Sequence, residues 1–218
     1  METLSSPTRI HLKPGETVNV EPGAMLAFSN CEMRTQLAAS SIFTRWLGGE
    51  SMIQNQFKAN RKGGWVALEE HMPGQIMKMT LTPFESPLLI RRTALIAESP
   101  NVELEPKYLG LSGFFSGRGI VMMRASVNEK QGDVHFHTTE GVVREIRVSS
   151  QEGSVYVDNS MILAYSESLR AEVTAAGQGV SSWFFSGEGL VTKFEGDGVI
   201  YVGAVNKQYQ PPAERREI

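Results

Sequence analysis

The chain has 218 residues, of which 41% are hydrophobic and 21% are charged, and its formal net charge is −3. This composition is typical of a folded protein, and the length allows one large β domain or two small ones. Proteins that bind nucleic acid usually carry a surplus of basic residues, which this chain lacks, so we expect no nucleic-acid partner.

The single cysteine, Cys31, cannot form a disulfide within the chain, which suits a reducing compartment. The first residues, METLSSPTRIHLKPGE, contain no apolar core of the kind that a secretory signal has. No run approaches the roughly 18 apolar residues of a membrane-spanning helix. We therefore expect a cytoplasmic protein without an integral membrane segment, in which Cys31 is a free, packed thiol.

One motif occurs three times along the chain. VNVEPGAMLAFS spans residues 18–29, LLIRRTALIAES spans 88–99 and VYVDNSMILAYS spans 155–166. Aligned without gaps, the first and third copies share Val, Leu, Ala and Ser at matching positions. The middle copy keeps apolar residues at its first and third positions and Ala-x-Ser at its end.

Two glycine markers follow each copy of this motif in the same order. The first marker comprises Gly49, Gly117 and Gly187, and the second comprises Gly64, Gly132 and Gly198. All three markers recur after about 68 residues, which predicts a structural unit repeated three times. The sequence therefore predicts one domain over residues 8–206, with units at about 8–80, 81–148 and 149–206, followed by a tail at 207–218.

Alternation of apolar and polar residues indicates short strands in each unit. VNV at 18–20 and VHFH at 134–137 alternate in this way, and Val, Ile, Phe, Tyr and Thr favour strands. Pro-Gly at 14–15 and 22–23 and Asp-Gly at 197–198 indicate turns. Short strands separated by such turns predict an all-β fold, a sandwich or barrel, built from three repeats.

The motifs LKPGE, PGAMLAFS, GGES, PGQIMKMTL, FFSG-x-G and VYVDNSMILAYS, in this order, resemble the mitochondrial-biogenesis family called "altered inheritance of mitochondria". The resemblance covers about residues 8 to 206. It implies a fold similar to that of the tryptophan RNA-binding attenuation protein, a β-sandwich of the double-stranded-helix type. It implies no catalytic residues, because the family has none that are established.

The attenuation protein itself binds tryptophan and RNA as a ring. No motif in this chain matches those contacts, and the acidic net charge argues against RNA. Similarity of fold alone does not transfer a function.

His135 and His137 are the best candidates for metal ligands. Residues i and i+2 of a strand face the same way, as two imidazole ligands would need. Cupins, which are also double-stranded β-helices, use such a pair with a nearby Glu and a distant His. Here Glu140, His11 and His71 could complete the set. The alternation of the strand places Phe136 in the core and both histidines on the solvent face, and there we expect them to bind no metal.

Paired aromatic residues occur at matching places in the three units. They are Trp46 in the first unit, Phe114 and Phe115 in the second, and Trp183, Phe184 and Phe185 in the third. Neighbouring residues of a strand point to opposite faces, so one of each pair enters the core. The other is exposed or is covered by a partner or a ligand, and the alternative is that these residues serve core packing alone.

Two sets of matching positions carry an acid, a base and an acid. They are Glu21, Arg91 and Asp158 in one set, and Glu50, Arg118 and Glu188 in the other. If the units surround an axis, Arg118 can lie between two carboxylates as a structural clamp. The alternative is three solvated turn residues in each set.

These observations leave three functions open. The first is a non-catalytic, self-associating scaffold or binding module without a cofactor, because the edge strands of a sandwich must be covered and oligomerisation is one way to do so. The second is a small-molecule-binding protein with an aromatic pocket between units or subunits. The third, a metal-dependent cupin-like enzyme, depends on His135 and His137 alone. No nucleophile elbow or phosphate-binding motif is present, so we expect no enzyme.

Overall fold

The computed structural model describes residues 7–37, 53–68, 75–108, 121–138, 143–174 and 191–203. These residues form eighteen strands, and the one helical element among them is a 3-10 turn at Asn159–Met161. The strands belong to four antiparallel sheets. The prediction of an all-β, sandwich-like fold is therefore confirmed.

The first six strands form two three-stranded groups. They are β1 (Thr8–Leu12), β2 (Thr17–Val20), β3 (Met25–Ser29), β4 (Cys31–Leu37), β5 (Ile53–Ala59) and β6 (Gly64–Leu68). In one group β6 lies between β1 and β3, and in the other β5 lies between β2 and β4.

The next six strands pair in the same order. They are β7 (Gln75–Leu81), β8 (Leu88–Arg91), β9 (Leu95–Glu98), β10 (Glu103–Tyr108), β11 (Val121–Ser126) and β12 (Gly132–Thr138). Here β12 lies between β7 and β9, and β11 lies between β8 and β10.

The last six strands follow the same order again. They are β13 (Arg144–Val148), β14 (Val155–Asp158), β15 (Ile162–Ser166), β16 (Arg170–Thr174), β17 (Val191–Glu195) and β18 (Gly198–Val202). β18 lies between β13 and β15, and β17 lies between β14 and β16. We refer to β1–β6, β7–β12 and β13–β18 as the first, second and third sets.

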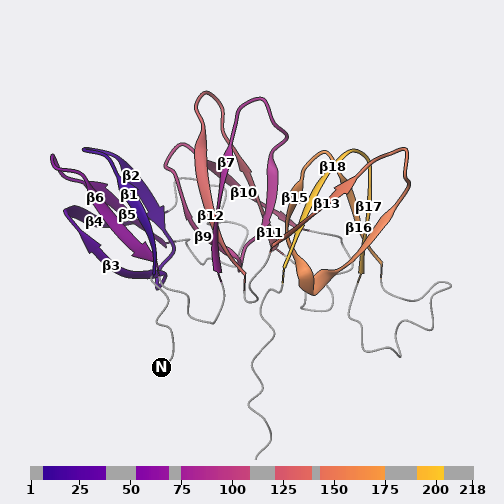
Figure 1. The fold of residues 1–218 in the computed structure, drawn as a ribbon, viewed down its shortest axis with the longest axis horizontal. Coiled ribbons are helices and arrows are strands. Elements are labelled where there is room, and N and C mark those ends of the chain that lie inside the picture. Colours follow the sequence, from indigo (N-terminus) through magenta and orange to yellow (C-terminus); the bar gives the residue numbers. More distant parts are fainter. Residues whose placement is uncertain are drawn as a thin grey trace, which may run out of the picture.

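Neighbouring sets share sheets. β2 of the first set pairs with β9 of the second, which gives a six-stranded sheet in the order β4-β5-β2-β9-β12-β7. β8 of the second set pairs with β15 of the third, which gives the order β10-β11-β8-β15-β18-β13. We call these pairings the first seam and the second seam. The three sets stand in a row, with the second set in the middle (Figure 1).

Each set encloses an apolar core between its two three-stranded groups. In the first set, for example, Leu12, Val20, Phe57 and Val66 come from both groups and belong to one buried cluster. The next set along the chain adds residues to that core. Ile96 of β9 belongs to the core of the first set.

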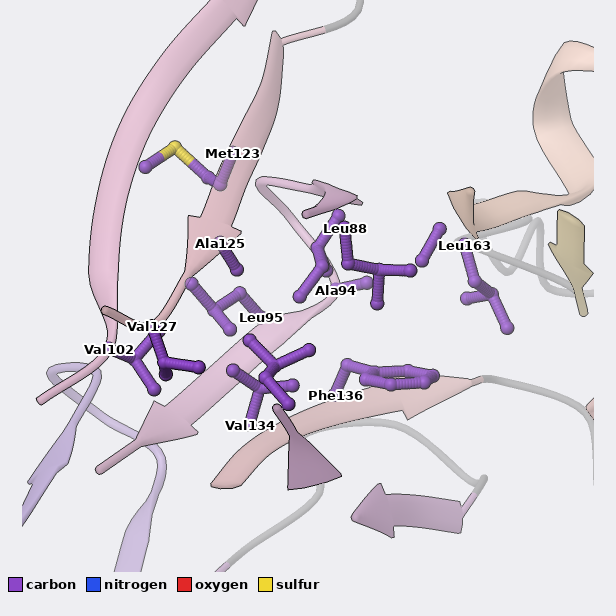
Figure 2. Packing of buried hydrophobic residues seen from close by; sticks show 13 residues of the cluster. Leu88, Ala94, Leu95, Val102, Met123, Ala125, Val127, Val134, Phe136 and Leu163 are labelled. Carbon is purple, nitrogen blue, oxygen red and sulfur yellow. The ribbon is translucent and has the colours of Figure 1, made fainter. Parts of the chain in front are cut away.

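The core of the second set is completed in the same way. Leu163 of β15 packs in it together with Leu88 and Phe136, as Figure 2 shows. A seam therefore joins two cores as well as two strands.

A bulge shapes β3, β9 and β15 alike. The register of β3 against β6 shifts between Met25 and Ala27, and that of β15 against β18 shifts between Ile162 and Ala164. The register of β12 shifts where it pairs with β9. Each bulge leaves one residue out of the ladder and bends its strand. That residue is Leu26, Ile96 or Leu163.

Candidate functional site

The first seam is polar. Asn19 on β2 lies opposite Glu98 on β9, and both side chains are buried. The Nε2 of Gln54 donates a hydrogen bond to Oε1 of Glu98 (2.8 Å), and the Nε2 of Gln56 donates to Oδ1 of Asn19 (3.1 Å). Both amides come from β5, so the first set supplies hydrogen bonds to a carboxyl group of the second set.

Burial dominates the ionisation of this carboxyl group. It raises the pKa of Glu98 to about 8, although hydrogen bonds from Asn19 and Gln54 oppose the shift. The neighbouring Glu21 is held by Arg92 of the second set, with 3.0 Å between Oε2 and Nη2. Burial also raises the pKa of Glu21, and the charge of Arg92 opposes that rise. Two acidic groups are thus enclosed where the first and second sets meet.

The second seam is apolar. Leu89 on β8 lies opposite Tyr165 on β15, and Ile90 lies opposite Ala164. These side chains are buried, and the ring of Tyr165 meets Phe194 edge-on with 5.0 Å between the ring centroids. The second seam buries an aromatic ring at the position where the first seam buries a carboxyl group.

The two three-stranded sheets each end in strands with one neighbour among the described residues, β1 and β3 in one sheet and β14 and β16 in the other. β3 is the last strand in the order β1-β6-β3, and β14 is the first in the order β14-β17-β16. Large apolar side chains on these strands are exposed: Leu26 by 50%, Phe28 by 40% and Tyr156 by 59%. We call β3 and β14 the open edges. They are the candidate interaction site of this protein.

The predicted solvent-facing histidine pair is wrong for His135. His135 is 5% exposed, and on β12 it lies opposite Lys78 of β7 on one side and Ala97 of β9 on the other. Burial lowers the pKa of His135 to about 4, so its imidazole is neutral at pH 7. His137 is half-buried, and Phe136 packs in the core as expected.

The other residues of the predicted metal site do not join this pair. His11 is exposed on β1 of the first set. Glu140 and His71 lie outside the described residues. Among the residues that are described, no group of three or more His, Cys, Asp or Glu side chains is arranged to hold a metal ion.

In the first charge set, Arg91 bonds to backbone carbonyls and also interacts with Asp158: burial lowers the pKa of Arg91, and the charge of Asp158 opposes that shift. Nε of Arg91 donates to the carbonyl of Ile162 (2.8 Å), and Nη2 donates to the carbonyl of Asn159. Glu21 pairs with Arg92, and Asp158 accepts a hydrogen bond from the backbone N–H of Ser160. Arg91 and Arg92 are neighbours in sequence, yet one reaches the third set and the other reaches the first.

Several predicted site residues lie outside the described residues. They are Trp46, Glu50, Phe114, Phe115, Arg118, Trp183, Phe184, Phe185 and Glu188. Their roles as pocket, interface or clamp residues therefore stay predictions. Cys31 lies in the described part as a half-buried free thiol beside the carbonyl of Ser29 (3.3 Å), and burial raises its pKa.

One hollow of about 200 Å³ lies between the segment that joins β7 to β8 and the neighbouring strands of the second set. Its walls include Pro83, Glu85, Glu103 and Arg124, and no described aromatic residue lines it. Pockets for small molecules usually measure about 300–1,000 Å³ and are largely apolar. This hollow does not supply the predicted aromatic pocket.

The fold and the open edges define a class of protein: an all-β, sandwich-like chain whose sets of strands join edge to edge. No helix in the described ranges is long and apolar enough to cross a membrane. Residues 3–204 match the family model described as mitochondrial biogenesis AIM24. The chain belongs to this family, so the predicted family membership is confirmed.

Two relatives from Streptococcus pyogenes are similar to the chain. One, from serotype M6, is described as uncharacterized protein M6_Spy0233 and is 24% identical over 90% of this chain and 80% of its own length. The other is the crystal structure of protein SPYM3_0169, with a TM-score of 0.69 and 24% identity, covering 91% of this chain and 88% of that chain. The similarity to the crystal structure supports the fold.

Proposed function

We propose that the protein is a non-catalytic, cytoplasmic scaffold or binding module that associates with copies of itself. The observation that carries this proposal is the pair of open edges at the two three-stranded sheets. Each has a strand neighbour on one side alone among the residues that the structure describes, and each exposes apolar side chains, so it offers a template for another strand.

The composition of the open edges supports association. Natural proteins usually protect an edge strand with Lys, Pro or an inward-pointing charge. β3 reads MLAFS and contains none of these, although it is short and carries the bulge at Leu26, and β14 reads VYVD with its only charge at the last position. A strand of another copy that paired with such an edge would cover its exposed apolar side chains.

The buried polar groups support a structural rather than a catalytic role. Glu98, Asn19 and Gln54 bond to one another inside the first seam. Groups that hold two sets of strands together in this way are enclosed and are not presented to a substrate.

Native mass spectrometry of the purified full-length protein tests the proposal. We expect defined assemblies of more than one chain at micromolar concentration, with no additional mass. A monomer at every concentration would contradict self-association. A reproducible extra mass on each chain would overturn the scaffold in favour of the small-molecule alternative.

A further inference from the structure

We propose that β3 of one copy pairs with β14 of a second copy and forms a third seam in the register of the two seams within the chain. This inference rests on the proposed self-association and specifies the surface that carries it. The occupant of each open edge is therefore the opposite open edge of another copy of this chain.

The two existing seams share one register. Val20 lies opposite Ala97 in the first seam, and Ile90 lies opposite Ala164 in the second. Val20 and Ile90 both hold the third position of the recurring motif, and Ala97 and Ala164 both hold its tenth. In both seams the early part of the motif in one set thus pairs with the late part in the next set.

The same register predicts which residues lie opposite each other in the third seam. The third position of the motif in the third set is Val157, and the tenth position in the first set is Ala27. Pairing these two residues puts Tyr156 opposite Phe28. The two exposed aromatic side chains of the open edges would therefore lie directly against each other, as cross-strand neighbours do.

Burial supports this placement. Leu89 and Tyr165 hold the positions of Tyr156 and Phe28 in the second seam, and they are only 6% and 2% exposed. Tyr156 and Phe28 are 59% and 40% exposed. The open edges thus expose apolar side chains at the positions that a formed seam buries.

Leu26 supplies a second, independent contact. The equivalent bulged residues Ile96 and Leu163 are buried, each in the core of the preceding set. Leu26 belongs to the first of the three described sets and is half exposed. In a third seam it would enter the core of the third set of the neighbouring copy, beside Val155 and Val157 of β14.

The positions of the open edges favour a second copy over closure within one chain. β3 lies at one end of the row of sets, and β17, to which β14 is paired, lies towards the other end, with the second set between them (Figure 1). The pairing of two different edges is head-to-tail. Such contacts repeat from copy to copy and produce a closed ring or a filament.

Blocking one edge at a time tests the seam. Phe28→Lys places a charge on β3 alone, and Tyr156→Lys places one on β14 alone. We expect each variant by itself to be monomeric in sedimentation velocity, because every contact needs one intact edge of each kind. Each substitution should weaken association by about ten-fold or more.

Mixing the two variants gives the discriminating result. Phe28→Lys keeps an intact β14, and Tyr156→Lys keeps an intact β3, so an equimolar mixture should form a 1:1 dimer and stop there. Phe84→Lys is the matched control, because Phe84 is an exposed aromatic residue away from both edges and should leave association unchanged. Thermal unfolding of each variant checks that it is folded.

A disulfide tests the register. In a Cys31→Ser background, Phe28→Cys with Tyr156→Cys should give chains cross-linked to one another, since opposite residues of antiparallel strands lie within disulfide range. Phe28→Cys with Val155→Cys should not, because Val155 points to the other face.

The outcomes separate the two proposals. If the wild-type protein associates and both lysine variants still do, the third seam is wrong and self-association stands. If the wild-type protein is monomeric, self-association itself is wrong. A disulfide within one chain would show that the two edges pair in the same copy and would overturn the second copy as the occupant.

Discussion

The first and second seams use the same strands, order and register but different chemistry. In the first seam, Glu98 and Asn19 face each other within a network of amides. In the second, Tyr165 and Leu89 face each other and extend an apolar core. The difference shows that backbone pairing and core insertion define a seam, whereas the facing side chains set how each seam responds to pH.

The largest expected effect is a difference between two equivalent bulged residues, Leu163 in the second seam and Leu26 on an open edge. Leu163→Ala removes a fully buried side chain from the core of the second set and should lower the free energy of unfolding by about 2–5 kcal/mol. Leu26→Ala should change it by less than about 0.5 kcal/mol. Chemical denaturation in the Tyr156→Lys background measures both without association. A similar loss for both would show that Leu26 is already packed within one copy.

The next effect concerns the titration of the first seam. The folded pKa of Glu98 is about 8, above its ordinary value of 4.5, so its contribution to stability is fully present below about pH 4.5 and is lost as the pH rises through 8. Glu98→Gln removes this loss. The stability of the variant relative to wild type should therefore grow between pH 5 and 8 by roughly 3–4 kcal/mol.

Unfolding curves at several pH values measure this change. Glu152→Gln is the control, because Glu152 is exposed on a turn and should show no such trend. A stability difference for Glu98→Gln that stays constant with pH would mean that Glu98 is ionised in the folded protein.

A smaller effect should separate the two neighbouring arginines. Arg92→Ala leaves the buried Glu21 without its cation and should destabilise by about 1–2 kcal/mol at pH 7. The loss should shrink towards pH 4, because Glu21 can then be protonated. Arg91→Ala removes two hydrogen bonds to backbone carbonyls of the third set, so it should destabilise the protein at both pH values.

Thermal denaturation at pH 4 and pH 7 makes this comparison. Arg34→Ala breaks the exposed pair between Arg34 and Glu32 and should change stability by less than about 0.5 kcal/mol at either pH. If Arg92→Ala behaved like Arg34→Ala, the contact of Glu21 with Arg92 would not stabilise the first seam.

The smallest effect should be that of Tyr156→Lys on the stability of a single copy. Tyr156 is more than half exposed, so the substitution should change the free energy of unfolding by less than about 0.5 kcal/mol at dilute concentration. The matching change in the second seam, Leu89→Lys, should destabilise strongly because it buries a charge. Unfolding at low protein concentration compares the two variants. An equal loss of unfolding free energy in both would contradict the difference between an open edge and a formed seam.

The sequence predicts the fold class well and the seams poorly. The alternation in residues 18–20 and 134–137 and the turn residues are local signals, and the structure confirms the strands that they indicate. A seam depends on which strand lies alongside, which no local pattern reveals. Phe28, Glu98 and Tyr165 hold the same position of the motif. The single acidic residue among two aromatic ones was the available signal that one seam differs in chemistry.

His135 also shows that a local sequence pattern does not reveal what surrounds a strand. Alternation correctly places Phe136 in the core, but it cannot tell whether the opposite face of β12 meets water. At His135 that face is buried, beside Lys78 and Asp133. The division into three repeats stays our proposal. Its support is that the same order of strand pairing occurs in the sets β1–β6, β7–β12 and β13–β18. In this division β7 and β13 belong with the strands that follow them in the chain.

Hydrogen–deuterium exchange of the wild-type protein and the Tyr156→Lys variant at the same high concentration tests end-to-end association most directly. In wild type, we expect the amides of β3 to be protected like those of the equivalent strands β9 and β15. In the variant, the amides of β3 that face away from β6 should exchange rapidly while β9 and β15 stay protected, because only the third seam is lost. Equal exchange of β3 in both proteins would contradict the pairing of β3 with β14 of another copy.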